Sequence, residues 1–221
     1  MASKIKLSRR KEYKEQLRAY IQLSKNLRAK IKRLFKKVSR KASSKYQIGL
    51  QVDDIMFSEF SDELYKVLSN HYRLVITQTA NRVIKLRTKQ DTEVDKIVND
   101  YIMQNTAQKV TQISETTRAL LTATIATGVA DGLGAVDMGK LIRRSVAFTD
   151  YRATMISRTE THTAQNYAGA KVIKVLGFKN PVKKWVSAND DRSRHWHKSM
   201  DKKKAISADE PFIVNTPTKY G

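Results

Sequence analysis

The chain has 221 residues, of which 40% are hydrophobic, enough for at least one compact core. It carries 43 lysines and arginines against 21 acidic residues, and this net charge of +22 favours nucleic acid or an acidic protein surface as partner over a membrane surface. The sequence has no cysteine, no apolar run long enough to cross a bilayer and no apolar leader after its basic start. We therefore expect a soluble intracellular protein without disulfides or thiolate metal sites.

Residues 1–45 are predicted to form a basic helical arm. They hold 17 lysines and arginines and only two acids, Glu12 and Glu15. Apolar residues at alternating four- and three-residue spacing, with Ser24 in the one polar gap, indicate a heptad seam: Tyr13, Leu17, Tyr20, Leu27, Ile31, Leu34 and Val38. The seam either docks on its own protein or pairs with a partner helix or DNA. The candidate residues for binding nucleic acid or an acidic partner are Arg9, Arg10, Lys11, Arg28, Lys30, Lys32, Arg33, Lys36, Lys37 and Arg40.

Residues 46–127 are predicted to be a helical bundle region. Apolar residues recur at helical spacing, and no proline occurs before Pro181, so we expect long antiparallel helices. Residues 128–139 hold four glycines and indicate a hinge and a domain boundary. They do not form a phosphate-binding loop, because no lysine followed by serine or threonine occurs there. A module over residues 140–221 follows.

The module begins with two predicted helices. Asp137 is expected to cap a helix that begins at Met138, and Thr149 or Asp150 to cap the next one, which runs to about residue 176 before Gly177 ends it. Glu160 lies in the middle of the stripe of this second helix that should face the core: Ala153, Ile156, Glu160, Ala164 and Tyr167.

A buried carboxylate such as Glu160 needs a partner. We expect a pairing with Arg192 or Arg194, because removing a charge from water costs several kcal/mol unless a counter-charge offsets it. The alternative role for Glu160 is that of a general base or metal ligand.

The pattern changes to period 2 after Gly177. Residues 182–187 alternate in hydrophobicity, residues 211–214 form a second apolar run, and these two short strands are expected to pair. Between them, residues 187–190 have turn composition, and the run from Asp190 to Arg194 is expected to open a short helix. The predicted fold is therefore mainly α, with long amino-terminal helices and a small carboxyl-terminal α+β module containing two short strands.

The segment 184–197 is rich in chemically active residues. It contains both tryptophans together with Asp190, Asp191, His195 and His197. A zinc site is disfavoured, because these ligands are crowded and the two histidines would point apart on a helix. A divalent-metal nuclease using Glu160, Asp190 and Asp191 is the enzymatic alternative. We expect no catalytic site, no metal and no cofactor, and assign the segment to tryptophan packing and Asp–Arg pairing.

A specific combination of residues occurs over roughly residues 137–214. Met155-Ile-Ser-Arg158-Thr-Glu160-Thr precedes a glycine-ended helix, and Trp185-Val-Ser-Ala-Asn-Asp190-Asp191-Arg192-Ser-Arg194, His197, Met200-Asp201 and Glu210-Pro211-Phe212 follow. This order resembles the tailed-phage head-morphogenesis family typified by the Mu F minor capsid protein. The shared motif residues are Arg158, Glu160, Trp185, Asp190, Asp191, Arg192, Arg194 and His197.

The resemblance implies a virion protein present in few copies and no established catalysis. It implies a location in the capsid interior, after synthesis in the host cytoplasm, and a role in head assembly and in packaging or delivering the genome. The expected partners are the portal protein, a capsid or scaffold protein, and double-stranded DNA bound by non-specific electrostatics. Many family members have Asp-Gly where this chain has Asp201-Lys202, and many continue into a Cys- or His-bearing tail that this sequence lacks.

Overall fold

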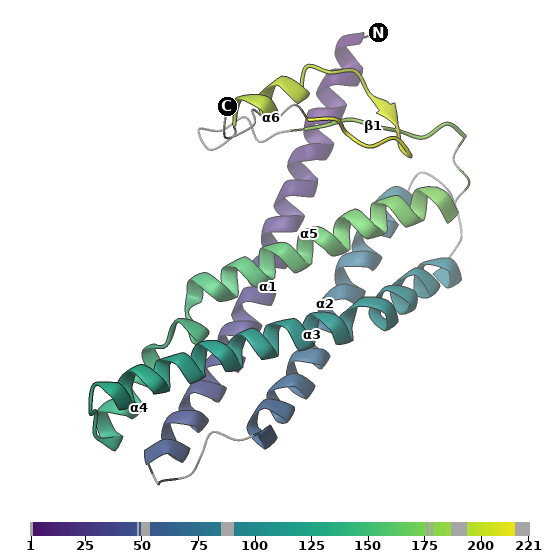
Figure 1. The fold of residues 1–221 in the computed structure, drawn as a ribbon. Helices are drawn as coiled ribbons and strands as arrows, with labels where there is room; N and C mark the ends of the chain where they lie inside the picture. Colours follow the sequence, from purple (N-terminus) through teal and green to yellow (C-terminus); the bar gives the residue numbers. More distant parts are fainter. Residues whose placement is uncertain are drawn as a thin grey trace. The chain divides into compact units, whose positions relative to one another are not determined.

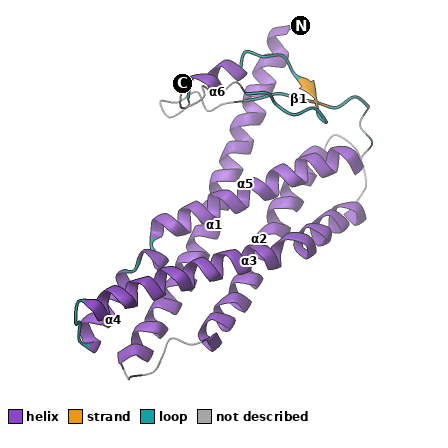
Figure 2. Cartoon of the chain, in the orientation of Figure 1, coloured by secondary structure: helices purple, strands orange, loops and turns teal. Residues whose placement is uncertain are grey.

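The computed structural model describes residues 2–47, 49, 54–84, 91–175, 177, 179–186 and 194–214. For residues 2–10, 12, 83, 84 and 91 it describes the backbone alone. These ranges contain six α-helices, one 3-10 helix and two short strands (Figure 1). Helix dominates this part of the chain (Figure 2), so the predicted fold class, mainly α with a small α+β module, is confirmed.

Two compact units share the chain, Met1–Gly169 and Ala170–Gly221. Unit 1 contains α1 (Ala2–Gln47), α2 (Asp54–Ile84), α3 (Asp91–Ala130), α4 (Ala135–Arg144), the 3-10 helix η1 (Val146–Phe148) and most of α5 (Asp150–Val175). Unit 2 contains the end of α5, β1 (Val182–Lys183), α6 (His195–Met200) and β2 (Ile206–Ser207). The sequence predicted four segments, residues 1–45, 46–127, 128–139 and 140–221. Their boundaries differ from the boundary between the two units, and this division of the chain stays a prediction.

The core of unit 1 comes from the apolar faces of α1, α2 and α3. Helix α2 packs most extensively on α3, and α1 packs on α2, α4 and η1. The largest fully buried side chains on the three long helices include Tyr72, Tyr101, Phe35, Leu27, Ile31, Leu64, Leu68 and Ile76. The long helices predicted from apolar periodicity are therefore present, and most of the described residues on their predicted apolar faces lie in this core.

The apolar seam of α1 divides into two parts. Leu27, Ile31, Leu34 and Val38 are buried in the bundle. Leu17, nearer the amino terminus, is 38% exposed. For the carboxyl-terminal half of α1, the structure thus selects docking on the same protein, and this docking directs the opposite face of the helix to solvent.

The glycine-rich segment lies inside unit 1 as a tight connection. Helix α3 continues through Gly128 to Ala130, and α4 begins at Ala135. A β-carbon at Gly128 would collide with Met138, and one at Gly139 would collide with Ser43 and Gln47 of α1. Ser43 Oγ also donates a hydrogen bond to the Gly139 carbonyl at 3.0 Å. The two glycines therefore permit close packing of α4 on α3 and α1.

Helix α4 begins earlier than predicted. Gly134 is its N-cap residue and makes no side-chain cap, while Asp137 lies in the first turn and pairs with Lys140. The prediction that Asp137 is the N-cap residue was wrong. A carboxylate inside the first turn interacts with the helix dipole as favourably as one at the N-cap, so the residue type does not distinguish the two positions.

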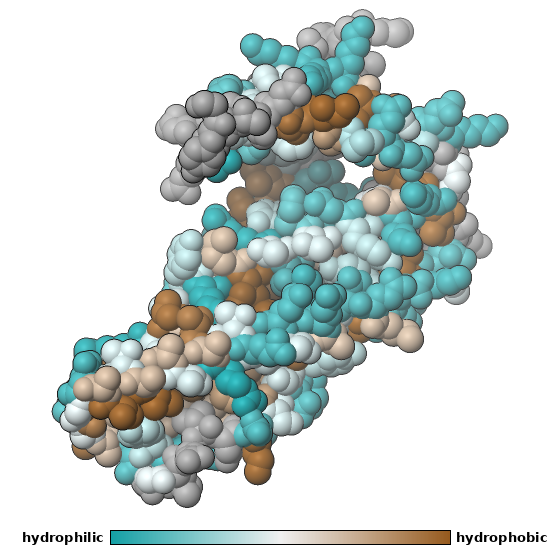
Figure 3. Space-filling model, in the orientation of Figure 1, coloured by the Kyte–Doolittle hydropathy of each residue, from teal (hydrophilic) through white to brown (hydrophobic). Residues whose placement is uncertain are grey.

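At the same end of unit 1, apolar side chains gather on the surface over α3 and α4, where Val129 and Val136 are exposed (Figure 3).

The predicted start of α5 is confirmed. Thr149 accepts a hydrogen bond from the Arg152 backbone N–H, as expected of an N-cap, and the helix ends at Val175, shortly before Gly177.

The second predicted strand was misplaced. β1 pairs antiparallel with β2 in the register Val182–Ser207 and Lys183–Ile206, whereas residues 211–214 are irregular. The short helix expected after residue 190 is α6.

Arg152 joins three elements of unit 1 through its guanidinium group. It donates to Thr117 Oγ1 (2.8 Å) and to the carbonyls of Ala147 (2.8 Å) and Ile113 (3.1 Å), and it lies over the ring of Phe35. Burial lowers the pKa of this guanidinium. The hydrogen bonds compensate part of the cost of burying the charge.

We predict that Arg152→Met lowers the free energy of unfolding by about 1–3 kcal/mol, because Met keeps the stem but removes the hydrogen bonds to Thr117 Oγ1 and to the carbonyls of Ala147 and Ile113. The measurement is urea unfolding followed by circular dichroism. Arg158→Met, an exposed change on the same helix, is the matched control and is expected to change stability by less than about 0.5 kcal/mol. Equal stability of the two variants would contradict the prediction.

Candidate functional site

The predicted motif residues occupy two different environments. Arg158 and Glu160 lie on α5 in unit 1, whereas Trp185, Arg194 and His197 lie in unit 2. Asp190, Asp191 and Arg192 lie outside the described residues. Each environment is therefore described by itself.

Unit 2 contains an aromatic cluster built around Trp185, which follows β1 and is half-buried. Its ring lies 5.5 Å from that of His197 on α6 and 5.4 Å from that of Phe212, which it meets edge to face. The ammonium group of Lys183 lies over the ring of Phe212, 5.2 Å from the ring centre. These contacts bring β1, α6 and the segment after β2 together within unit 2, and the shape-maintaining role expected for Trp185 and His197 stays a prediction.

The two histidines of α6 both contact the ring of Trp196, and only His197 also contacts Trp185 among the described residues. His195 contacts Trp196, whose ring also lies beneath the guanidinium of Arg194, while His197 contacts Trp185. Within the described residues no group of three or more His, Cys, Asp or Glu side chains is arranged to hold a metal ion.

Glu160 is buried in the core of unit 1, with 5% of its surface exposed. Tyr72 on α2 donates a hydrogen bond to Glu160 Oε2 at 2.6 Å. Burial and the neighbouring carboxylate both raise the pKa of Tyr72, so its hydroxyl stays protonated and remains a donor. The structure thus provides a tyrosine partner for Glu160, while Arg194, one of the two expected partners, lies over Trp196. Arg192 is not among the described residues.

The burial of Glu160 bears on its chemistry. A nuclease carboxylate must approach a metal ion beside a DNA phosphate, and a side chain enclosed between α5 and Tyr72 is poorly placed for that approach. Arg158, two residues away, is exposed, and its backbone carbonyl accepts a hydrogen bond from Tyr20 at 3.4 Å. Both contacts attach α5 to neighbouring helices of the bundle.

A second buried polar pair lies next to the first. His71 Nε2 is 2.9 Å from Thr161 Oγ1, and Thr161 donates its only hydroxyl proton to the Ser157 carbonyl at 2.6 Å. His71 must therefore donate through Nε2. Burial, aided by the charge of Lys30, lowers the pKa of His71 to about 4, so the imidazole is neutral at pH 7.

Tyr72, His71 and Arg152 were not identified as polar anchors from the sequence. The ring of Tyr72 is buried in the apolar core, while its hydroxyl donates a hydrogen bond to Glu160. The available signal was the position of Glu160 on a core-facing stripe, which predicts a buried donor without saying which helix supplies it.

The ten basic candidates on α1 differ in their pairing. Arg9 and Arg10 have side chains outside the described residues. Arg28 and Lys32 both pair with Asp150, and the Arg28 hydrogen bond is the main cause that lowers the pKa of Asp150 to about 2. Lys37 pairs with Glu63. The remaining candidates, Lys11, Lys30, Arg33, Lys36 and Arg40, are exposed.

None of the described helices is both long and apolar enough to cross a membrane.

Tyr72 and Tyr101 provide a matched pair of variants. The Tyr101 hydroxyl is buried without a hydrogen-bond partner in the described structure. We predict that Tyr72→Phe lowers the free energy of unfolding by about 1.5–3 kcal/mol, because the buried Glu160 carboxylate loses a donor. Tyr101→Phe is expected to be neutral or stabilising, since it removes an unsatisfied hydroxyl. Chemical unfolding measures both, and a larger loss for Tyr101→Phe would contradict the assignment.

The pKa of His71 predicts a pH dependence. The unfolded state binds a proton near pH 6.5 and the folded state only near pH 4, so unfolding takes up protons between these values. The contribution of His71 to the free energy of unfolding is fully present above pH 6.5. It falls by up to about 3 kcal/mol as the pH drops to 4. We expect His71→Gln to flatten the unfolding free energy over this range relative to the unsubstituted chain. Parallel pH profiles would contradict the prediction.

One comparison with known proteins gives a match. Residues 119–220 match the model of the family described as Phage Mu protein F like protein. The match begins within α3, ahead of residue 137, where the resemblance was expected to begin, and includes all of α4, η1, α5 and the described part of unit 2. No curated protein and no solved structure matches the chain. The resemblance inferred from the motif residues is confirmed by the family match.

Proposed function

We propose that the chain, whose residues 119–220 match the Phage Mu protein F like family, acts as a minor capsid component inside the head, close to the portal. In this role it aids head assembly and the packaging or delivery of the genome. The family match over residues 119–220 is the observation that carries the proposal. Its proposed partners are the portal protein and a capsid or scaffold protein, with double-stranded DNA bound by charge.

The arrangement of the described residues supports a binding role. The motif residues Trp185 and His197 pack against each other, and Glu160 is enclosed by the bundle. Such residues maintain shape, and shape is what an assembly component must present to its partners. The excess of basic residues, +22 over the whole chain, suits a compartment filled with DNA. Before assembly the chain is proposed to reside in the host cytoplasm.

The test is incorporation into heads. We expect the tagged full-length chain to co-purify with heads assembled in an infected host, at few copies per head, and to resist external protease until the heads are opened. Trp185→Ala should reduce incorporation, because it removes the ring that joins His197 and Phe212. Val186→Ala, a truncation of the exposed neighbour, is the matched control.

Two results would contradict the proposal. One is the absence of the chain from infectious heads. The other is degradation by external protease while the heads remain intact. Circular dichroism of each purified variant separates loss of a docking surface from loss of the fold.

A further inference from the structure

A row of cations runs along the solvent side of α1. At 100° per residue, eight exposed basic residues fall within a sector of about 100° on the helix surface; Lys32 pairs with Asp150, and the other seven form no ion pair with a described residue. We call these residues the basic ridge: Lys11, Lys14, Arg18, Lys25, Arg33, Lys36 and Arg40. The ridge covers 29 residue steps, or about 43 Å of helix.

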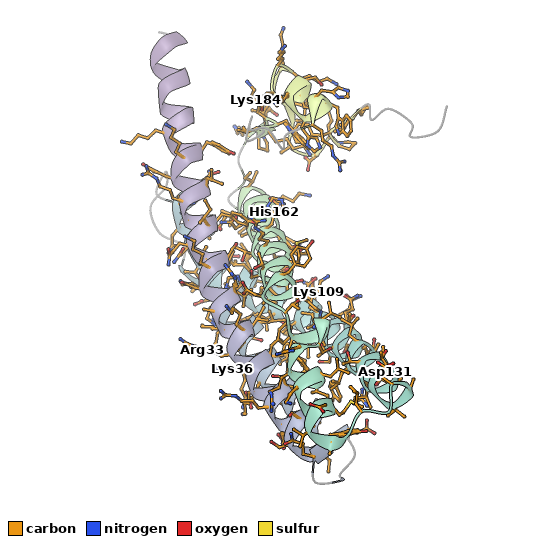
Figure 4. The ribbon with its side chains drawn as sticks, turned by 90° about the vertical axis from the view of Figure 1, so that its left-hand side faces the viewer. Arg33, Lys36, Lys109, Asp131, His162 and Lys184 are labelled. Atoms are coloured by element: carbon orange, nitrogen blue, oxygen red, sulfur yellow. The ribbon has the colours of Figure 1, made fainter. Side chains whose placement is uncertain are left out.

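The direction of the ridge is fixed by the packing of α1. Leu27 and Ile31 are completely buried on the other side of the helix. Figure 4 shows Arg33 and Lys36 extending outward from α1, away from the side on which Lys109 lies. After Arg40 the ridge ends, because Ser43 at the next position of the sector is buried against Gly139 of α4. The cations are therefore held on one straight, solid support.

The charges of the ridge are not used within the described part of the chain. Arg28, Lys37 and Lys41, on the flanks of α1, and Lys32, at the edge of the sector, pair with Asp150, Glu63 and Glu59. None of the seven ridge side chains forms an ion pair or hydrogen bond with a described residue. Glu15 is an exposed carboxylate at the edge of the sector. Most basic residues on the flanks of α1 are thus paired, whereas the seven residues of the basic ridge are unpaired within the described part of the chain.

We propose that the basic ridge binds the phosphate backbone of duplex DNA along its length. This inference rests on the proposed location inside the head. Seven unpaired cations on a straight support match the regular charge of a duplex, which carries one phosphate per about 1.7 Å of axis and is stiff over the length of the ridge. Binding would also relieve the mutual repulsion of the seven charges.

The composition of the ridge separates duplex DNA from other polyanions. The other described side chains within the sector include Gln22 and Ala29, and none of the described ones is aromatic. Single-stranded nucleic acid is bound by stacking of bases on aromatic rings, which the ridge does not offer. A protein partner needs an apolar centre in its interface, which the ridge also lacks. Charge-only contacts with a duplex backbone require neither feature.

The test compares two full-length variants with the same loss of charge. The ridge variant carries Arg33→Gln, Lys36→Gln and Arg40→Gln, and the control carries Lys66→Gln, Lys96→Gln and Lys109→Gln on α2 and α3. Affinity for a short duplex is measured by fluorescence anisotropy over a series of salt concentrations. We expect the ridge variant to lower the slope of log K against log salt by about 2 to 3, and the control to leave it nearly unchanged. Duplexes of unrelated sequence should bind equally.

Three outcomes would overturn the proposal. They are equal slopes for the ridge variant and the control, tighter binding of single-stranded than of duplex DNA, and a ridge variant that keeps DNA binding but is lost from heads. The last would identify an acidic head protein as the occupant of the ridge. A lower slope of log K against log salt for the ridge variant supports DNA binding by the ridge, even if the unsubstituted chain is absent from heads. Absence from heads contradicts only the proposed function.

Discussion

The buried apolar face of α1 is the constraint on which the arrangement of unit 1 depends. Leu27, Ile31 and Phe35 are anchored in the core, so the rotation of this helix about its axis is fixed. A helix with so many like charges is not expected to be stable in isolation, because the charges repel one another and the apolar face would be exposed to water. Packing on α2, α4 and η1 supplies the stability, and the ion pairs of Arg28, Lys32 and Lys37 neutralise the flanks. The orientation of the other described basic side chains on α1 follows from these contacts.

The attachment of α5 follows a different rule. Its fully buried residues within unit 1 are small or polar: Ala153, Ser157, Glu160, Thr161, Ala164 and Ala168. Large apolar side chains hold α1, α2 and α3 together, whereas α5 is attached by hydrogen bonds from Tyr72 and His71, by those of Arg152 and by the contact of Tyr167 with Tyr101. Polar contacts of this kind are strongly directional, so they specify the position of the helix more than they contribute to stability. The family match includes this helix and its polar residues.

Periodicity in the sequence predicted most of the helical architecture because the apolar residues of α1, α2 and α3 recur at one spacing. The cap at Thr149 was equally predictable, since a hydroxyl at that position accepts from the first free N–H groups. The start of α4 was missed because Gly134 provides no side-chain signal. The second strand was misplaced because β2 is only two residues long, and strands this short have no measurable alternation.

The candidate site was predictable in parts. A core-facing Glu160 could be inferred from helix geometry, but its partner Tyr72 lies 88 residues away on another helix, and sequence spacing contains no information about that contact. The packing of Trp185 with His197 and Phe212 joins residues that the sequence separates by a turn and a helix. The division of the α1 cations into paired and unpaired sets depended on the positions of Asp150 and Glu63, which only the tertiary structure provides.

The small buried face of α5 has a thermodynamic consequence. Heat-capacity change and denaturant sensitivity both scale with the surface that an opening reaction exposes. Separating α5 from the bundle would expose three alanines, a few polar groups and the half-buried side chains of Ile156 and Tyr167, and would uncover part of Tyr72 and Tyr101. Such an opening would respond weakly to urea, and its free energy would vary almost linearly with temperature. Global unfolding of α1, α2 and α3 would instead show the strong curvature of a large apolar core.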